Sequence, residues 1–241
     1  MNYYGSLCTE MYEILHKNPP QDELKFYLSY AKKNENILEP LCGSGRFLVP
    51  FLKKGFDIKG IDNSAEMISK LKQKSPNAKI IQSNIEHYQT DEKFDYIFIT
   101  SGSVSLFTDM KLCQNILQKM KNLLKTNGKF IFAVDTIANC CEDDTVLAVK
   151  TKENYDLILK TKNHYDAQTH TQFSPGIYEL YDGKNLLQSE QMDFQTHLYE
   201  FGEMENILCQ IHFNKITVYS DFDKSIAINN QAKMFLYECI L

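Results

Sequence analysis

Between Asn36 and Asp135, short apolar runs alternate with amphipathic segments, and this alternation narrows the possible folds more than any other feature of the chain. Such a rhythm is typical of βαβ units that build a largely parallel sheet. The pattern predicts strands over 36–41, 56–61, 79–82, 94–99 and 129–134, and helices over 46–54, 64–74 and 109–124.

The region after residue 140 breaks this rhythm. Residues 146–201 hold several strand-like runs with turn signals at 174–176 and 182–183, and they lack a crossover helix. A helix is expected near 202–211, followed by strands over 215–221 and 233–240 that can pair as an antiparallel hairpin. We therefore expect an α/β fold: a Rossmann-like, doubly wound, seven-stranded sheet with an antiparallel last strand, plus an inserted antiparallel β flap.

Charge and composition argue against several classes of partner. The chain has 26 Lys and Arg against 31 Asp and Glu, a net charge of -5, so it has no general field that would attract a nucleic acid or an anionic membrane. No apolar stretch reaches the roughly 18 residues that suggest a membrane span, and the first residues do not resemble a secretory signal. We therefore expect a soluble protein without nucleic-acid or membrane partners.

The cysteines suggest a reducing compartment. Seven cysteines are scattered along the chain without the paired CxxC spacing of a zinc site. They are expected to be reduced thiols in a cytoplasmic protein, and no metal site is predicted.

The turn after the first predicted strand carries the chemistry. This strand includes the acidic residue Glu39, and Gly43 and Gly45 follow before the first helix. Glycine lacks a Cβ, so a ligand can approach the bare backbone there, at the edge of the sheet where ligands bind. Asp62 ends the second strand 19 positions after Gly43, and its carboxylate can accept hydrogen bonds from both hydroxyls of a ribose.

The spacing between Gly43 and Asp62 alone also suits a nicotinamide dinucleotide. The dinucleotide fingerprint has a third glycine, for helix packing and pyrophosphate approach, at the position that Leu48 occupies. Leu48 thus argues against a pyrophosphate ligand, and an NAD(P)-dependent oxidoreductase remains the alternative function.

Two of these segments resemble a known family. Residues 39–47, which contain LCGSGR, and residues 60–67, GIDNSAEM, resemble the first two motifs of class I S-adenosylmethionine-dependent methyltransferases. The two together are most similar to the small-molecule branch that includes glycine N-methyltransferase and the N,N-dimethyltransferases of amino sugars. Residues 94–97 resemble the fourth motif, and residues 199–204 and 218–222 also resemble that branch. The resemblance implies a methyltransferase that uses S-adenosyl-L-methionine on a small molecule, with nitrogen as one candidate acceptor atom.

The resemblance also implies roles for single residues. Gly43 and Gly45 would contact the amino-acid end of the cofactor and Glu39 its amino group, while Asp62 would bind the ribose. The adenine would lie beside Met67, with Asn63 nearby. Cofactor contacts are further implied at Asn84 and Ile85 at the end of the third strand, at Ser101 and Gly102 after the fourth, and at Arg46.

Asn84 departs from the family pattern, and Arg46 has two possible roles. Asn84 stands where the family commonly has an aspartate, so an uncharged amide would meet the adenine amino group. Arg46 has two interpretations: its guanidinium binds the cofactor carboxylate, or it is a solvated residue of the first helical turn.

Methyl transfer needs alignment more than a covalent nucleophile. Aromatic faces stabilise cations, and in the resembling families the segment that contains Tyr3, Tyr4 and Tyr12 folds over the cofactor. Tyr4 and Tyr12 are the expected contacts, with ordinary packing of a lid as the alternative. No residue is distinguished as a general base. The weak catalytic candidates are Tyr4, His164 and Tyr178, together with His170 and His197 in or near the flap, and for each of these a surface or packing role is the alternative.

The chain is expected to form one methyltransferase domain with four parts. These are an N-terminal helical lid (1–35), a cofactor-binding half (36–140), the inserted β flap (141–201), and a C-terminal helix and β hairpin (202–241). A binding module that keeps the cofactor pocket without transferring a methyl group is a further alternative. The oligomeric state does not follow from the sequence.

Overall fold

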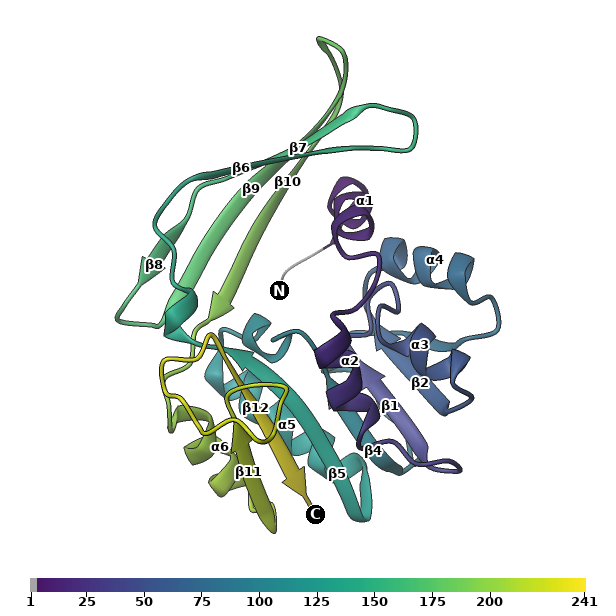
Figure 1. Ribbon diagram of the computed structural model, residues 1–241, viewed down its shortest axis with the longest axis vertical. Coiled ribbons are helices and arrows are strands. Elements are labelled where there is room, and N and C mark those ends of the chain that lie inside the picture. The colour runs from purple at the N-terminus through teal and green to yellow at the C-terminus, as the bar shows by residue number, and fades with distance from the viewer. Residues whose placement is uncertain (1–3) are drawn as a thin grey trace.

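A seven-stranded sheet forms the body of the protein in the computed structural model, which describes residues 4–241 (Figure 1). Its strand order is β11-β12-β5-β4-β1-β2-β3. All neighbouring strands run parallel except β12, which is antiparallel to both β5 and β11, so the expected Rossmann-like sheet is confirmed. The strands are β1 (Asn36–Pro40), β2 (Asp57–Asp62), β3 (Lys79–Gln82), β4 (Phe94–Ile99), β5 (Leu124–Asp135), β11 (Lys215–Tyr219) and β12 (Met234–Ile240).

Helices cover both faces of this sheet and make three layers. On one face α2 (Gln21–Leu28), α3 (Leu48–Lys53) and α4 (Ala65–Lys74) pack through buried residues such as Tyr27, Phe51 and Leu71. On the other face α5 (Met110–Leu123) and α6 (Glu203–Ile211) bury one apolar stripe each. Burial on both faces explains why β4 reads as an almost continuous apolar run.

The expected helix starts are present where a side chain caps them. The Ser64 hydroxyl accepts a hydrogen bond from the Met67 amide at 3.1 Å at the start of α4. Asp109 caps α5 by accepting from the amides of Lys111 and Leu112. Ser64 has a second task, because its hydroxyl lies 3.0 Å from the Tyr4 carbonyl and joins the N-terminal segment to α4.

The junction between α5 and β5 differs from the sequence prediction, in which the helix over 109–124 is followed by a turn at Asn127-Gly128 and by a strand from residue 129. The helix stops at Leu123 and β5 begins at Leu124. Leu124 is buried and pairs with Phe94, whereas the next paired residues are Tyr96 and Lys129. Asn127 has a φ of 61° within this irregular stretch, so the Asn-Gly signal marks a bulge inside the strand.

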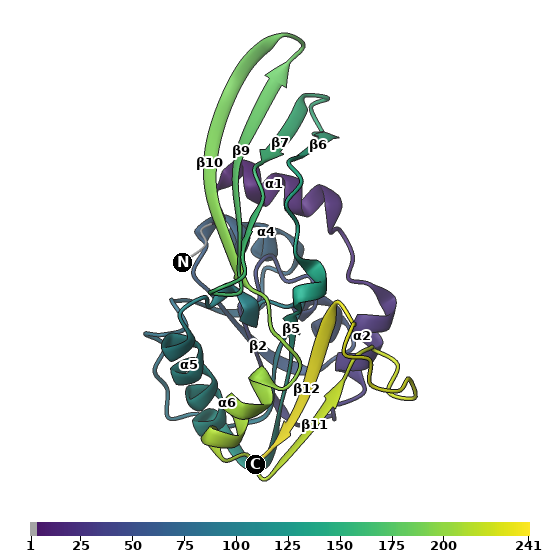
Figure 2. The same cartoon turned by 90° about the vertical axis from the view of Figure 1, so that its left-hand side faces the viewer.

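The inserted flap is a separate five-stranded antiparallel sheet, as expected, and it stands away from the body in Figure 1. Its order is β10-β9-β7-β6, with β8 also paired to β9. Helix α1 (Ser6–Leu15) lies between this flap and α4 (Figure 2). The strands are β6 (Thr145–Lys150), β7 (Asp156–Thr161), β8 (His164–Asp166), β9 (Thr171–Asp182) and β10 (Asn185–His197).

The turn predicted at residues 174–176 is wrong, because Pro175 and Gly176 lie inside β9. Proline lacks an amide hydrogen and normally avoids a central strand. It is tolerated here because β7 pairs as far as Gly176 and β8 starts opposite Phe173, so the neighbouring strand is interrupted beside Pro175. The turn predicted at Asp182 and Gly183 does join β9 to β10, and Gly183 has a φ of 59°.

Within residues 4–241, no helix is long and apolar enough to cross a membrane.

Removal of either side-chain cap should lower the stability of the protein by a similar amount. Ser64→Ala and Asp109→Ala should each lower the free energy of unfolding by about 1 kcal/mol, because each leaves amides of a first helical turn without an acceptor. Only Ser64→Ala should also speed hydrogen exchange in residues 6–15, since only Ser64 bonds the N-terminal segment. Urea unfolding and exchange mass spectrometry measure both effects. Equal exchange of residues 6–15 in the two variants would contradict the assigned role of Ser64.

Candidate functional site

A cavity of about 300 Å³ opens where β1, β2 and β4 end at the same edge of the sheet. Loops that follow these strands form its floor, and the N-terminal segment with α1 forms its roof. We call it the crevice. It is lined by Tyr4, Tyr12, His16, Leu41, Gly43, Arg46, Asp62, Asn63, Met67, Ser101, Ser103, Leu106 and Phe107.

The loop after β1 uses its two glycines differently. Both Gly43 and Gly45 have positive φ, 51° and 79°, which favours glycine. A Cβ on Gly43 would have only the Met67 sulfur near it, at 4.0 Å, so this glycine keeps the crevice open. A Cβ on Gly45 would lie 2.8 Å from the Leu71 side chain, so Gly45 lets the loop pack against α4 and is not part of the lining.

Asp62 lies in the lining and also braces the loops around it. Its carboxylate accepts a 2.7 Å hydrogen bond from the Gly43 amide and a 2.9 Å bond from the Ser64 amide. Burial raises the pKa of Asp62, and the bonds from these amides act against that rise. The residue thus links the loop after β1 to the start of α4.

Glu39 lies beneath the crevice and is almost fully buried. Burial, followed by the charges of Asp62 and Glu23, raises the pKa of Glu39 well above its ordinary range. The Leu48 amide hydrogen-bonds this carboxylate, but its Oε2 atom has no partner among the described residues. A buried carboxylate oxygen without a donor is costly, so this atom indicates a place for a water or a cationic ligand group.

The loop after β4 is held by a third acid. Glu23 of α2 accepts a hydrogen bond from the Ser101 amide at 2.9 Å. Ser101 has a φ of 55°, a conformation that is uncommon for a residue with a side chain. Glu23, Glu39 and Asp62 therefore concentrate acidic groups around the floor of the crevice.

The roof is aromatic and carries a histidine that the sequence reasoning missed. Tyr4, Tyr12 and His16 all line the crevice, and the Tyr12 and His16 rings lie 4.8 Å apart. Burial, and then the charge of Arg46, lowers the pKa of His16 from its ordinary value, so its ring is neutral at pH 7. The spacing of four between Tyr4, Cys8, Tyr12 and His16 is a signal for this row, although only Cys8 and Tyr12 lie within α1 and Tyr4 and His16 flank it.

The contacts of Arg46 decide between the two predicted roles of its side chain. It lines the crevice, yet its Nε donates to the Asn18 carbonyl at 3.4 Å, and its side chain hydrogen-bonds Tyr12. The residue is therefore fixed against the lid and is not a freely solvated side chain.

Other predicted contacts lie outside the lining. Ile85 is in the core, and the Asn84 side-chain oxygen accepts from the Glu86 amide. Gly102 is buried against Asp135, which a Cβ would meet at 2.6 Å. Tyr3 lies outside the described residues. The sequence reasoning did not name Leu41, Ser103, Leu106 and Phe107, which do line the crevice.

The catalytic candidates from the flap are dispersed. His164 is exposed and lies 3.3 Å from Glu142. His197 is buried and bonds Glu203 at 2.6 Å, with His170 on the other Glu203 oxygen at 3.7 Å. His170, His197 and Glu203 are the group within residues 4–241 whose side-chain atoms lie close enough to bind one metal ion. They lie at the base of the flap and outside the crevice.

A second cavity, of about 310 Å³, separates α1 from the flap. We call it the flap chamber. Tyr4, Tyr12 and His16 line both cavities, so the crevice and the flap chamber meet at these three residues. Tyr178, one of the catalytic candidates, lines the flap chamber.

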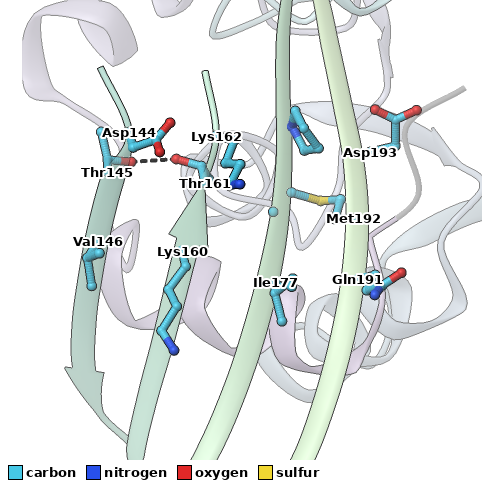
Figure 3. Close-up of a pocket in the computed structure, with 12 residues that line it drawn as sticks. Asp144, Thr145, Val146, Lys160, Thr161, Lys162, Ile177, Gln191, Met192 and Asp193 are labelled. Carbon is cyan, nitrogen blue, oxygen red and sulfur yellow. Dashed lines mark hydrogen bonds between the residues drawn. The ribbon is translucent and has the colours of Figure 1, made fainter. Parts of the chain in front are cut away.

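A hollow of about 720 Å³ lies on the flap (Figure 3). Val146, Lys160 and Ile177 line it. These positions alternate along their strands with Leu147, Leu159 and Tyr178, which line the flap chamber, so this part of the hollow lies on the opposite face of the flap. Thr161 and Met192 line both the hollow and the flap chamber. None of the residues that form the crevice contributes to it.

Comparisons with known proteins place this architecture in a family. A family profile described as a methyltransferase domain matches residues 31–195. Malonyl-[acyl-carrier protein] O-methyltransferase 1 from Ilyobacter polytropus is 32% identical over 117 residues, which are 46% of this chain and 42% of that protein. The match thus spans less than half of that relative's length.

Two solved structures share the fold over almost the whole chain. The CcbJ methyltransferase from Streptomyces caelestis superposes with a TM-score of 0.78 at 16% identity, over 98% of this chain and 96% of that one. The sugar N-methyltransferase KedS8 from Streptoalloteichus sp. gives a TM-score of 0.75 at 12% identity, over 94% and 91%. Because the family profile covers more than half of the sequence and the fold agrees with it, the chain belongs to the methyltransferase domain family.

Proposed function

We propose that the protein is an S-adenosyl-L-methionine-dependent methyltransferase that acts on a small molecule. The observation that carries this proposal is the crevice itself: Asp62 and Gly43 line it, and the unpartnered Glu39 oxygen lies beneath it. When bound, S-adenosylmethionine supplies a methyl group activated by attachment to a positively charged sulfur.

The residues of the crevice fit this ligand. An ammonium group on the ligand, directly or through a water, would give the Glu39 Oε2 atom the donor that it lacks. Asp62 has lone pairs left for ribose hydroxyls after bonding the amides of Gly43 and Ser64. Gly43, Asn63 and Met67 would border the nucleoside, with Ser101 and Arg46 toward the amino-acid end.

The same acids disfavour a dinucleotide. A pyrophosphate carries negative charge, and the acidic side chains of Glu23, Glu39 and Asp62 around the floor of the crevice offer it no positive charge. Leu48 fills the place of the third glycine that such a ligand needs, and it is fully buried at the start of α3. An NAD(P)-dependent oxidoreductase is therefore the weaker proposal.

The flap chamber would hold the acceptor, because Tyr4, Tyr12 and His16 line both this chamber and the crevice. The relatives suggest two acceptor atoms: one is described as an O-methyltransferase and another as a sugar N-methyltransferase. We propose nitrogen or oxygen of a small molecule. Tyr4 and Tyr12 would shield the reacting centre from water and present aromatic faces to a cationic sulfur.

His16 is the residue best placed to take a proton. The acceptor heteroatom provides the electron pair of the new bond to carbon and must lose one proton to end uncharged. His16 lies where the two cavities meet, and its lowered pKa leaves a ring nitrogen able to accept that proton at pH 7. His164, exposed and paired with Glu142, is less suited to this role.

The whole described chain would then act as one catalytic domain. Of the predicted lid, residues 1–35, the described part (4–35) would close the site; 36–140 would bind the cofactor, 141–201 would bound the acceptor, and 202–241 would complete the sheet. We propose a cytoplasmic location, since the described cysteines include no disulfide.

Cofactor binding is tested with S-adenosylhomocysteine by calorimetry. The wild-type protein should bind it at micromolar concentration, and Asp62→Asn should weaken binding at least tenfold because the amide replaces one acceptor with a donor. Gly43→Ala should also weaken binding, since its Cβ enters the crevice, whereas Gly45→Ala should mainly lower stability because its Cβ meets Leu71. NAD and NADP should cause no thermal shift. A folded wild-type sample that binds a dinucleotide instead would overturn the proposal.

Proton acceptance by His16 is tested by His16→Gln. Turnover should fall by roughly 10²–10⁴-fold, while the dissociation constant of S-adenosylhomocysteine stays within about threefold. Wild-type activity should drop on the acid side of the ordinary histidine pKa, because protonation removes the base, and this acid limb should vanish in His16→Gln. His164→Gln is the matched control and should change neither. An unchanged acid limb in His16→Gln would assign the proton to another group.

A further inference from the structure

The flap chamber is bounded by apolar side chains from two parts of the chain that are far apart in sequence. Helix α1 contributes Met11 and Leu15, and four flap strands contribute the facing wall. Of its lining residues, none is Asp, Glu, Lys or Arg. The facing wall consists of Leu147, Leu159, Thr161, Ser174, Tyr178, Met192 and Phe194.

The polar atoms in this lining are few, and several are already engaged. The Tyr178 hydroxyl donates to the Cys8 sulfur at 3.4 Å, and the Thr145 and Thr161 hydroxyls lie 2.5 Å apart. Burial raises the pKa of the Cys8 thiol to about 11 and raises that of Tyr178, so both are neutral at pH 7. A ligand inside the chamber therefore meets no ionised side chain.

One acid close to the chamber is hydrogen-bonded by the start of α1. Glu190 of β10 accepts from the Leu7 amide at 3.0 Å and the Cys8 amide at 3.3 Å, and the Ser6 hydroxyl lies 3.2 Å from it. Glu190 thus caps the N-terminus of α1, where Gly5 has no side chain that could do so. This bond also holds α1 against the flap and so fixes the width of the chamber.

We infer that the flap chamber binds a methyl acceptor with an uncharged, mainly apolar body, such as an alkyl chain or a substituted aromatic ring. This inference rests on the proposed function, because the chamber meets the crevice at His16 and the acceptor atom would lie there. A nucleotide-linked or phosphorylated acceptor needs cations for its phosphates, and the chamber lining supplies none at pH 7. A polyhydroxylated sugar would leave hydroxyls without partners against Met11, Leu159 and Met192.

The volume of the chamber indicates the approximate size of the part of the acceptor that it can hold. A volume of about 310 Å³ corresponds to about ten water-sized groups at 30 Å³ each. A phenol ring with a short alkyl chain fills that space. Apparent affinity should therefore rise along a series of alkylphenols and stop rising once the chamber is full.

Calorimetry on the full-length protein tests this, with phenol, 4-ethylphenol, 4-propylphenol and 4-butylphenol as probes. Binding should tighten by about threefold to fourfold for each added methylene until the chamber is full. Uridine diphosphate glucose and glucosamine, each at the same concentration, should not bind. The inference is overturned if either polar probe binds, or if chain length has no effect on the affinity of the alkylphenols.

A buried charge provides the second arm. Leu159→Glu should weaken 4-propylphenol binding at least tenfold while leaving the dissociation constant of S-adenosylhomocysteine within about twofold. Leu186→Glu is the matched control, because Leu186 is 52% exposed on the same flap and lies outside the chamber lining, and it should change neither affinity. If Leu159→Glu does not fold, Met192→Gln should give a smaller loss of 4-propylphenol binding in the same direction. Equal binding in a folded Leu159→Glu variant and in wild type would overturn the inference.

The two proposals fail separately. A folded protein that does not bind S-adenosylhomocysteine overturns the methyltransferase function, and the alkylphenol series, measured without that ligand, still decides the character of the chamber. Binding of S-adenosylhomocysteine together with uridine diphosphate glucose would keep the function and overturn the apolar acceptor.

Discussion

The carboxylate of Asp62 holds the candidate site together. It accepts hydrogen bonds from the Gly43 amide, which belongs to the loop after β1, and from the Ser64 amide at the start of α4. Charge-assisted bonds of this kind are stronger than those between neutral groups. Because Ser64 in turn bonds the Tyr4 carbonyl, one acid at the end of β2 orients both the floor of the crevice and the entry to its roof.

Burying acids around a crevice has a cost that a suitable ligand can reverse. Burial raises the pKa of Glu39 and Asp62, which means that the folded protein disfavours their charged forms. A cationic ligand that approaches these groups would restore favourable interactions for the ionised carboxylates. Such binding would offset part of the desolvation penalty of these carboxylates, so the acids favour a positively charged ligand over a phosphate.

The sequence predicted the body of the fold well because its signals are local. Alternating apolar runs located β1 to β4, and the helices predicted over 64–74 and 109–124 begin where Ser64 and Asp109 cap α4 and α5. The cofactor motif predicted Gly43, Asp62 and Met67, all of which line the crevice. Local signals failed where context decides: Pro175 marked a turn in isolation but lies in β9 beside an interrupted neighbour, and Gly45 serves packing against Leu71.

The flap chamber could not be predicted from local patterns, because its two walls come from α1 and from the flap, which are far apart in the sequence. Glu190 caps a helix that begins 184 positions earlier, and nothing near Glu190 in the sequence indicates this partner. The position of His16 between two cavities depends in the same way on distant segments, because His16 follows the last turn of α1 and faces the flap.

The row formed by Tyr4, Cys8, Tyr12 and His16 places one short segment against two cavities. Cys8 and Tyr12 lie in α1, Tyr4 and His16 flank it, and the row lines the crevice at Tyr4, Tyr12 and His16 and the flap chamber along its whole length. Any displacement of α1 therefore changes both cavities at once. Since Glu190 attaches this segment to the flap and Ser64 attaches it to α4, the relative position of the two cavities depends on these two sets of hydrogen bonds.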